Sequence, residues 1–528
     1  MGGLLRAAAT VSGLTLVSRI LGFGRDVIIA GVLGAGTGAD AFFVAFKLPN
    51  LFRRLFAEGA FHAAFVPIFS GLLEGEGRVA ARRFAERALA LLVWTLLAIT
   101  LVMEIVMPWA VPVLAPGFTD TAGKLALTAD LARITFPYLL FIAVVALLSG
   151  MLQGVGRFAA AAAAPILLNV VLIAAALTLP ALGMAPAFAL AWGVAAAGVV
   201  QFLWLLAHTV RAGFPVRLPR PRLTARSRTL VRRVGPGAVG AGVYQINIVA
   251  DTIFASLVGE GAVSWLYYAD RITQLPLGVV GTAVGLALLP MLSRQLKAGQ
   301  EAGAMDSQNR AAEFALLLTI PAMGALMVVP APVIGVLFER GAFGAGDTAA
   351  TAGALMAFAL GLPAYVAVKV LAPGFFARGD TRTPVIMASL GFTANIGLNL
   401  ALMGPLGHVG IALATSLAQW LNAGTLAMVL ARRGFLRVDA RLKSRAWRIA
   451  AATLGMAAGL WGGRRALAPL FDAGPWAGAG GLAALVLGGI LVYAALARLA
   501  GAATLGELKA AMRRSGGGTD AGGGETRP

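Results

Sequence analysis

Long apolar segments, separated by short polar loops, dominate the chain. Two of them read LALLVWTLLAITLVMEIVMPWAVPVLA and WAGAGGLAALVLGGILVYAALARLA. A helix of about 20 apolar residues crosses the hydrocarbon core of a bilayer, and about fourteen segments of that length follow one another here. The pattern therefore predicts an all-α polytopic membrane protein with about 14 transmembrane helices.

The composition agrees with a membrane protein and changes how the charge is interpreted. Hydrophobic residues make up 59% of the chain and charged residues 12%, against about 45–50% and about 25% in soluble domains. A formal net charge of +20 is also typical of nucleic-acid-binding proteins. Here the basic residues gather in short loops between apolar segments, as membrane proteins place them on the cytoplasmic side. We therefore expect membrane lipids, and not nucleic acid, as surroundings and partners.

The loops alternate in charge along the chain. One set is rich in Arg and Lys, for example GEGRVAARRFAER, RAGFPVRLPRPRLTARSRTLVRR and ARRGFLRVDARLKSRAWR. The other set, which includes GAGTGAD, PGFTDTAGK and GPLGHVG, has almost no basic residues. Because one alternation fits every loop, the positive-inside rule predicts an even number of spans with both termini in the cytoplasm. The first span has no cleavable signal pattern and is expected to be retained.

An internal repeat predicts the domain organisation. The segments AFFVAFKLPNLFRRLFAEGAFHAAFVPIFS and SWLYYADRITQLPLGVVGTAVGLALLPMLS align without a gap, and a second pair of segments places Asn169 near Asn395. Chance similarity among Ala- and Leu-rich helices is the alternative. A parallel repeat predicts two pseudo-symmetric six-helix lobes that alternate access to a site between them. The expected domains are an N-terminal lobe (1–218), a C-terminal lobe (219–436), a C-terminal helix pair (437–505) and a disordered cytoplasmic tail (506–528).

Charged residues lie inside the predicted spans, where each costs at least about 2.5–3.5 kcal/mol on insertion scales. In the first span, one arc of the helix collects Ser18, Arg19, Gly22, Arg25 and Asp26. The first two spans together carry more cations than anions, namely Arg19, Arg25, Lys47, Arg53 and Arg54 against Asp26, Asp40 and Glu58. A network that only joined helices would tend towards neutrality. The surplus therefore favours a cationic, water-filled cavity, with stapling of helices as the alternative.

The prevalence of arginine narrows the predicted ligand. A guanidinium group stays charged and binds phosphate through two parallel hydrogen bonds. We therefore expect a phosphate or pyrophosphate ligand and not an organic cation, which would require buried carboxylates. Pro49–Asn50 predicts a break or bend in the second span that could let a lipid tail pass sideways. Whether Arg53 or the adjacent Arg54 faces the cavity stays open.

Four segments closely resemble the MviN/MurJ family of bacterial lipid II flippases, within the superfamily of multidrug, oligosaccharidyl-lipid and polysaccharide exporters. They read SRILGFGRD, GADAFFVAFKLPNLFRRLFAEGAFHAAFVPIFS, YYADRITQLPLGVVGTAVGLALLPMLS and FFARGDTRTPV. The resemblance implies two six-helix lobes and a C-terminal helix pair that forms a groove for the lipid tail. It also implies the ligand, an undecaprenyl-pyrophosphate that carries a disaccharide-pentapeptide, and a location in the bacterial cytoplasmic (inner) membrane.

The resemblance further implies individual substrate-binding residues. The family's cavity arginines match Arg19, Arg25, Arg53 and Arg271, and its functionally important acid matches Asp40. Three more residues fall on cavity positions, namely Ser18, Asp26 and Asn169. Gln274 stands where relatives often carry an acid, so we expect no charged role there.

Oxygen-bearing side chains also suggest a cation site. Asp251 lies inside the seventh predicted span, Asn395 and Asn399 share one face of the eleventh, and Thr415 lies in the twelfth. Oxygen ligands suit hard cations, and the resemblance implies coupling to an ion gradient or to the membrane potential, with Na+ held in the C-terminal lobe of some members. The prediction is a Na+ site. The alternative is that Asn and Thr make interhelical hydrogen bonds.

Other functions lack sequence support or stay open as rivals. The chain has no G-x-x-x-x-G-K-[ST] loop for ATP, no cysteine and no recognisable catalytic set, so we expect a transporter and not an enzyme. The rivals are a flippase for another polyprenyl-linked glycan, a cation or drug antiporter of the same superfamily, and a scaffold or receptor with structural buried charges. A self-contained two-lobe bundle needs no partner subunit, so a monomer is expected.

Overall fold

A computed structural model describes residues 2–56 and 60–502 of the chain. Every regular element in this part is a helix, which confirms the predicted all-α class. Contacts divide the chain into two compact units. Unit 1 comprises Met1–Ser264 together with Arg340–Phe343, and unit 2 comprises Trp265–Glu339 and Gly344–Pro528.

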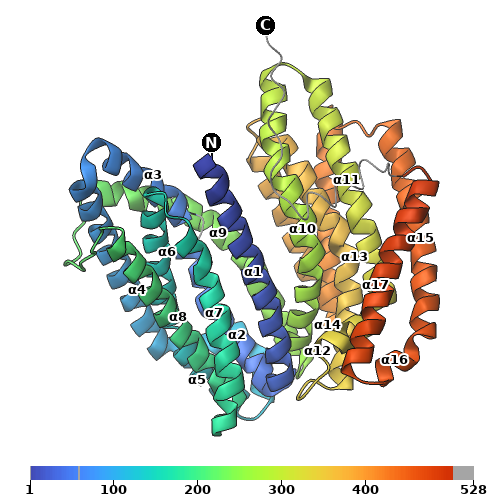
Figure 1. Cartoon of the computed structure of the whole chain (residues 1–528), viewed down its shortest axis with the longest axis horizontal. Coiled ribbons are helices and arrows are strands. Elements are labelled where there is room, and N and C mark those ends of the chain that lie inside the picture. The colour runs from blue at the N-terminus through green and yellow to red at the C-terminus, as the bar shows by residue number, and fades with distance from the viewer. Residues whose placement is uncertain (1, 57–59, 503–528) are drawn as a thin grey trace. The chain divides into compact units, whose positions relative to one another are not determined.

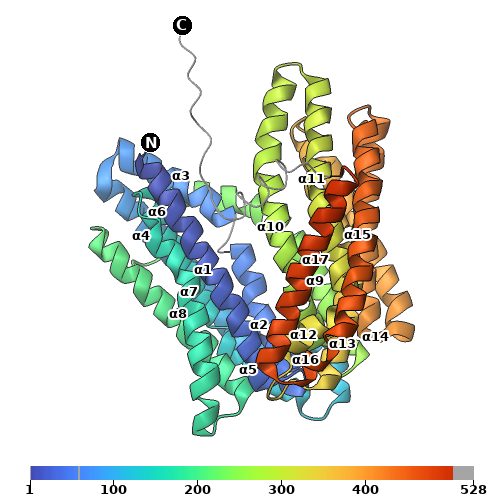
Figure 2. The same cartoon turned by 45° about the vertical axis from the view of Figure 1, so that its right-hand side comes forward.

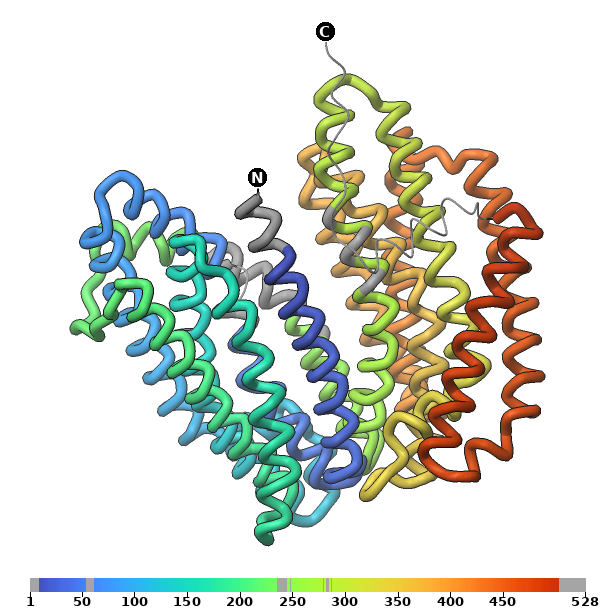
Figure 3. The backbone as a smooth tube through the Cα atoms, viewed as in Figure 1, coloured from blue at the N-terminus to red at the C-terminus, as the bar shows by residue number. Residues whose placement is uncertain are grey.

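Unit 1 is built mainly from antiparallel helices (Figure 1). They are α1 (Gly2–Leu33), α2 (Thr37–Phe56), α3 (Ala60–Gly75), α4 (Gly77–Leu114), α5 (Lys124–Thr135), α6 (Tyr138–Gly154), α7 (Ala159–Thr178), α8 (Pro186–Arg211) and α9 (Ala225–Val258), with the 3₁₀ turns Pro116–Asp120 and Pro180–Leu182. The main contacts join α7 to α8 and α1, α6 to α8, and α2 to α5. Figure 3 follows this part of the chain from α1 in dark blue to α9 in green.

Unit 2 takes up the second half of the chain. Its helices are α10 (Ala262–Lys297, which begins in unit 1), α11 (Glu301–Val328), α12 (Pro330–Phe338), α13 (Ala345–Phe376), α14 (Arg382–Arg432), α15 (Ala440–Ala466), α16 (Ala468–Asp472) and α17 (Pro475–Leu499). A core of Val and Leu side chains joins α10 to α13, and α13 packs on α14 and α11. The last long helices, α15 and α17, lie side by side (Figure 2).

The described residues contain eight helical segments that are long and apolar enough to cross a membrane. One of them, α14, holds two helices, because Gly407 interrupts it with a non-helical backbone conformation (φ 57°, ψ −136°). These segments support a multi-pass membrane protein, whereas the number of about fourteen spans stays a prediction. The domain limits at residues 218, 436 and 505 also stay predictions, and the predicted disordered tail lies outside the described residues.

Helix α2 is not broken at Pro49. Proline has no N–H to donate to the carbonyl four residues earlier, so Ala45 O would be left without its helical partner. The hydroxyl of Thr135 on α5 lies 3.3 Å from Ala45 O and 3.2 Å from Ala132 O of its own helix, so its one proton is shared between the two carbonyls. Asn50 Nδ2 also donates to Phe46 O at 3.0 Å. A neighbouring helix thus compensates in part for Pro49, and α2 continues as one helix from Thr37 to Phe56. The alternative prediction of a bend at Pro49 is not tested.

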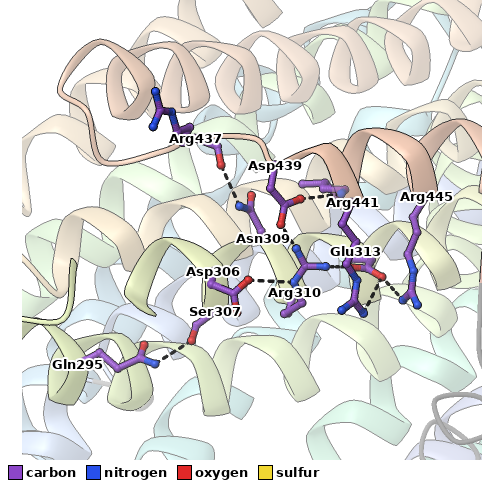
Figure 4. Close-up of polar contacts among 11 residues, drawn as sticks. Gln295, Asp306, Ser307, Asn309, Arg310, Glu313, Arg437, Asp439, Arg441 and Arg445 are labelled. Atoms are coloured by element: carbon purple, nitrogen blue, oxygen red, sulfur yellow. Dashed lines mark hydrogen bonds and ion pairs between the residues drawn. The ribbon is translucent and has the colours of Figure 1, made fainter. Parts of the chain in front are cut away.

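A charged cluster fastens α15 to α11 (Figure 4). The carboxylate of Glu313, whose side chain is only 6% exposed, pairs with Arg310, Arg441 and Arg445. Arg310 also pairs with Asp439, the residue directly before α15. Removal of one partner from a buried ion pair costs about 3–5 kcal/mol. The cluster therefore fixes where the C-terminal helices begin within unit 2.

The motif FFARGDTRTPV forms the connection between α13 and α14. Asp380 accepts hydrogen bonds from Thr383 N at 2.9 Å, Thr383 Oγ1 at 2.6 Å and Arg433 Nη1 at 2.6 Å. The bonds from Thr383, and then the contact with Arg433, hold the pKa of Asp380 well below its ordinary value of 3.8. The described contacts of this acid are therefore those of a loop that begins α14.

Candidate functional site

Helices α1 and α7 bring four of the predicted site residues together. Arg25 donates to Asp26 Oδ1 from Nη2 at 2.7 Å and from Nε at 3.1 Å, and Arg25 Nη1 donates to Asn169 Oδ1 at 3.0 Å. Asn169 Nδ2 in turn donates to the backbone oxygen of Ser18 at 2.9 Å. Gly22 lies beside this contact, and a Cβ there would meet Asn169 Nδ2 at 3.4 Å, an ordinary van der Waals distance. We call Ser18, Arg25, Asp26 and Asn169 the α1–α7 group.

Side chains from two helices, Asp26 on α1 and Asn169 on α7, hold the guanidinium group of Arg25. The side chains of Arg25 and Asp26 are 12% and 3% exposed, respectively. An ion pair so well shielded from water needs hydrogen bonds to its remaining groups, and Asn169 supplies one of them. Arg25 is thereby held in a fixed direction, which is the property that recognition of a phosphate group requires.

Two further predicted arginines lie in unit 1. Arg19 is exposed, and it makes no hydrogen bond or ion pair with other described residues. Arg53 is half-buried, and its Nε donates to Asn50 Oδ1 on the same helix at 3.1 Å. The side chain of Arg54 lies outside what the structure describes, so the choice between Arg53 and Arg54 is not tested.

Asp40 is fully buried and surrounded by donors. Its side-chain oxygens accept hydrogen bonds from Lys124 Nζ at 2.8 Å, Gly261 N at 2.8 Å, Ser264 N at 3.0 Å and Ser264 Oγ at 2.7 Å. Lys124, also buried, lies 4.2 Å from the centre of the Phe118 ring. In this conformation both oxygens of the Asp40 carboxylate accept hydrogen bonds from other groups of the protein. A role in binding the substrate stays a prediction, one that would require these bonds to open.

Sequence reasoning did not single out Lys124. The residue lies 84 positions from Asp40, so no local pattern links the two. A signal was present nevertheless, because PGFTDTAGK belongs to the loops that have almost no basic residues, and Lys124 is its single cation. A lone cation in such a loop has no topological reason to be there, and it indicates a structural partner.

In unit 2, the predicted cavity arginine Arg271 lies on α10. It is half-buried, and its guanidinium carbon lies 4.6 Å from the centre of the Tyr267 ring, a cation–π contact. Gln274 donates a hydrogen bond to Asp270, one helical turn earlier on α10. The neutral residue at position 274 therefore binds the neighbouring acid and adds no charge of its own.

A second cation of unit 2 was not predicted. Lys369 lies on α13 and crosses over Gly281 of α10, where a Cβ would come within 2.4 Å of Lys369 Nζ. Lys369 makes no hydrogen bond or ion pair with other described residues. It is the one charged residue in the apolar run LPAYVAVKVLAPGFF, and a lysine inside a predicted span could have identified it.

Three of the four residues predicted to bind Na+ lie together in α14. Asn395 Nδ2 donates to Thr415 Oγ1 at 3.4 Å, and Asn399 Nδ2 donates to Asn395 Oδ1 at 3.1 Å. All three side chains are buried. Asp251 lies on α9 in unit 1, so the structure does not test whether it joins them. Buried oxygen-bearing side chains fit a hard cation in chemical type, and the hydrogen bonds also fit simple interhelical contacts.

A cavity of about 350 Å³ opens beside the α1–α7 group in unit 1. Residues of α1, α6 and α7, with Phe158 just before α7, line it, namely Val11, Thr15, Ser18, Ser149, Gln153, Phe158, Ala161, Ala162 and Pro165. Its wall mixes hydroxyl and amide groups with apolar side chains, and Ser18 belongs both to the wall and to the α1–α7 group. Such a lining suits an amphiphile, a molecule with a polar head and an apolar tail.

The chain is similar to known proteins over most of its length. Residues 29–476 match the family model described as "Lipid II flippase MurJ". A "Probable lipid II flippase MurJ" of Rhizobium tropici is 47% identical over 437 residues, which are 82% of each chain. A relative of the same description from Rhizobium meliloti (strain 1021) is 44% identical over 517 residues, 97% of this chain and 96% of the relative.

Solved structures agree with these relatives. A lipid II flippase MurJ in an inward closed conformation aligns with a TM-score of 0.76 at 25% identity and covers 93% of this chain and 98% of that chain. An inward-facing multidrug resistance MATE family transporter of the MOP superfamily aligns with a TM-score of 0.67 at 15% identity, over 81% of this chain and 98% of its own, a likeness of fold alone. The chain belongs to the lipid II flippase MurJ family of multi-pass membrane proteins.

Proposed function

We propose that this protein moves lipid II from the inner to the outer leaflet of the bacterial cytoplasmic membrane by alternating access. The observation that carries the proposal is the α1–α7 group, which holds an arginine in a fixed direction and shares Ser18 with a cavity suited to an amphiphile, in a chain that belongs to a lipid II flippase family. Lipid II joins a pyrophosphate to a long polyprenyl chain. A guanidinium group binds the first, and an apolar cavity wall accommodates the second.

Arg25 would act as an oriented electrostatic partner of the pyrophosphate. Asp26 and Asn169 hold its guanidinium group, so little side-chain entropy is lost when the ligand binds. Arg19, which is exposed on the same helix, would add a second positive charge. Arg53 and Arg271 would contribute from α2 and α10. These arginines would bind the pyrophosphate by charge and hydrogen bonds alone, so the ligand could be released unchanged on the other side of the membrane.

The proposed orientation places both termini in the cytoplasm. The Arg-rich loops, such as the one between α8 and α9, would then face the cytoplasm, and the loops poor in basic residues would face outwards. Lipid II would enter from the cytoplasmic leaflet, and the protein would act as a monomer.

We also propose that Na+ binds at Asn395, Asn399 and Thr415 with Asp251 as the anionic member. Na+ binding would supply the driving energy of an ion gradient. Thermal unfolding of the purified protein in NaCl and in KCl tests this proposal. Na+-specific stabilisation that disappears in Asp251→Ala supports it, and an equal response to the two salts in the unaltered protein contradicts it.

Complementation of a flippase-depleted bacterium tests the transport function. Growth and the exposure of lipid II on the outer leaflet are measured together for the unaltered protein, Arg25→Ala and Arg25→Lys. We expect rescue by the unaltered protein, none by Arg25→Ala and weak rescue by Arg25→Lys, because an ammonium group cannot bond Asp26 and Asn169 in the same fork geometry.

The matched control is Arg232→Ala, which removes an equal charge from an exposed side chain that has no described partner. All variants are compared at equal abundance in the membrane. The proposal is contradicted if Arg25→Ala exposes as much lipid II as Arg232→Ala, or if the unaltered protein fails to rescue.

A further inference from the structure

A second cavity lies in unit 1, away from the α1–α7 group. It measures about 200 Å³, and its wall comes from the beginning of α4 and the beginning of α9. The lining residues are Glu76, Ala80, Arg83, Phe84, Arg87, Thr224 and Arg226. Three of them are arginines and one is an acid, so the wall carries a net positive charge. We call it the α4–α9 cavity.

Two of the three arginines have no partner in the part of the chain that the structure describes. Arg83 and Arg87 are one helical turn apart on α4, and neither makes a hydrogen bond or ion pair with other described residues. Like charges at this spacing destabilise a helix by about 0.2–0.5 kcal/mol. Both line the same cavity. The arrangement therefore leaves two guanidinium groups available to an anion.

The acids close to this cavity are already engaged. Glu76 accepts two hydrogen bonds from Arg226 Nη2, at 2.6 and 2.9 Å. Glu86 pairs with Arg82 at 3.5 Å and accepts from Arg217 N at 3.3 Å. Neither acid is bonded to Arg83 or Arg87. Since no carboxylate of the described residues pairs with Arg83 or Arg87, an external anion would be their partner.

The cavity wall is held in place by ordered contacts. Arg78 Nη2 donates to Ala212 O at 2.7 Å, and its guanidinium carbon lies 4.5 Å from the centre of the Phe214 ring. Thr224 caps α9 by accepting from Ser227 N at 3.3 Å. The α8–α9 connection is thus bonded onto α4. The segments that carry the lining arginines are therefore held together by ordered contacts.

Exposed apolar side chains flank the cavity and indicate the kind of anion. Val79, next to Ala80, is 58% exposed, and Leu223, next to Thr224, is 66% exposed. Leu218 of the same connection is 53% exposed. Apolar side chains beside cationic ones are typical of a surface at the boundary between lipid headgroups and acyl chains. A soluble anion would gain nothing from them, whereas a phospholipid would.

We propose that the α4–α9 cavity binds the phosphate of an anionic glycerophospholipid through Arg83 and Arg87, with the acyl chains against Val79 and Leu223. Guanidinium groups bind phosphate bidentately, and basic pockets between membrane helices take anionic headgroups. The bound lipid ties the α8–α9 connection to α4. This site is separate from the α1–α7 group and does not depend on the transport activity.

Binding of phosphatidylglycerol to the full-length protein in detergent tests the proposal, with native mass spectrometry to count bound lipids and thermal unfolding to measure stabilisation. Phosphatidylcholine and inorganic phosphate are the comparison ligands. We expect one phosphatidylglycerol to bind at least about tenfold more weakly to Arg83→Gln/Arg87→Gln. The matched control is Arg222→Gln/Arg228→Gln, which removes equal charge from exposed residues of the same region outside the cavity wall.

Three outcomes overturn the proposal. Equal weakening in the two double variants means that diffuse charge, and not the cavity, attracts the lipid. Unchanged binding in Arg83→Gln/Arg87→Gln removes the two arginines from the site. Competition by millimolar inorganic phosphate, with equal stabilisation, assigns the cavity to a soluble phosphate compound. Lipid II exposure in cells is a separate measurement, so failure here leaves the proposed transport function untouched.

Discussion

Lys124→Met is expected to reduce the stability of unit 1 strongly. Lys124 and Asp40 are 2% and 0% exposed, and the distance from Lys124 Nζ to Asp40 Oδ2 is 2.8 Å. At an effective dielectric constant of about 20, two unit charges at this distance attract by about 6 kcal/mol. Methionine preserves the apolar stem and removes the charge. We expect a loss of about 3–5 kcal/mol in the free energy of unfolding, because an uncompensated buried carboxylate remains.

A double-mutant cycle with Asp40→Asn separates the ion pair from simple packing. Unfolding of the purified protein is measured in mixed micelles for both single variants and the double variant, and Lys297→Met serves as the control for loss of an exposed lysine. The double variant should cost at least about 2 kcal/mol less than the sum of the single variants, since neither charge is then left alone. The reasoning is refuted if Lys124→Met costs less than about 1 kcal/mol, or if the two costs simply add.

Three further predictions concern the backbone and one loop. Gly341→Ala should destabilise by at least about 1–2 kcal/mol, because φ is 57° and a Cβ would lie 2.2 Å from a backbone oxygen. Gly344→Ala, where a Cβ would meet no atom within 4 Å, should cost clearly less, namely the modest loss of a glycine at the N-cap of α13. Equal unfolding temperatures of the two variants would contradict this prediction. Thr135→Val should lower the free energy of unfolding by about 1 kcal/mol, because Ala45 O loses its hydroxyl donor. The loss should be smaller in a Pro49→Ala background, where the restored N–H of residue 49 donates to Ala45 O. An equal loss in both backgrounds would exclude Thr135 as the compensating donor. Because the pKa of Asp380 is lowered in the folded state, its contribution to stability is complete above the ordinary value of 3.8 and lost as the pH falls below it. Asp380→Asn should flatten the acid limb of thermal unfolding followed from about pH 6 to about pH 3, and a limb of unchanged slope would count against the assignment.

Much of the fold and part of the site follow from sequence because they depend on local periodicity. The arc of polar residues in α1 places Arg25 and Asp26 on one side of a helix, and the contact with Asn169 follows from the packing of α1 on α7. The apolar runs likewise predict helices of spanning length. Where the side chains of a feature lie on one face of a single helix, the periodicity of the sequence is sufficient to predict that they lie together.

The remaining features depend on contacts between distant segments. A break or bend at Pro49 is a sound local expectation, yet α2 is continuous, and Thr135, which lies 90 residues from Ala45, shares its hydroxyl proton with the carbonyl that Pro49 leaves without a partner. The partner of Asp40 is likewise on another helix. Asp380 in the motif FFARGDTRTPV bonds locally to Thr383, but it also bonds Arg433, 53 residues away, and this second contact could not be read from the local sequence. Tertiary contacts of this kind leave no periodic signal in the chain.

The most direct test of the central claim uses the purified protein in liposomes that contain lipid II in one leaflet. A membrane-impermeant reagent that binds lipid II reports its arrival in the other leaflet. Transfer is expected with the unaltered protein and with Arg232→Ala, whereas Arg25→Ala is expected to give transfer only at the protein-free rate. Lipid II that stays in its leaflet with the unaltered protein, or that crosses equally well with Arg25→Ala, would contradict the central claim.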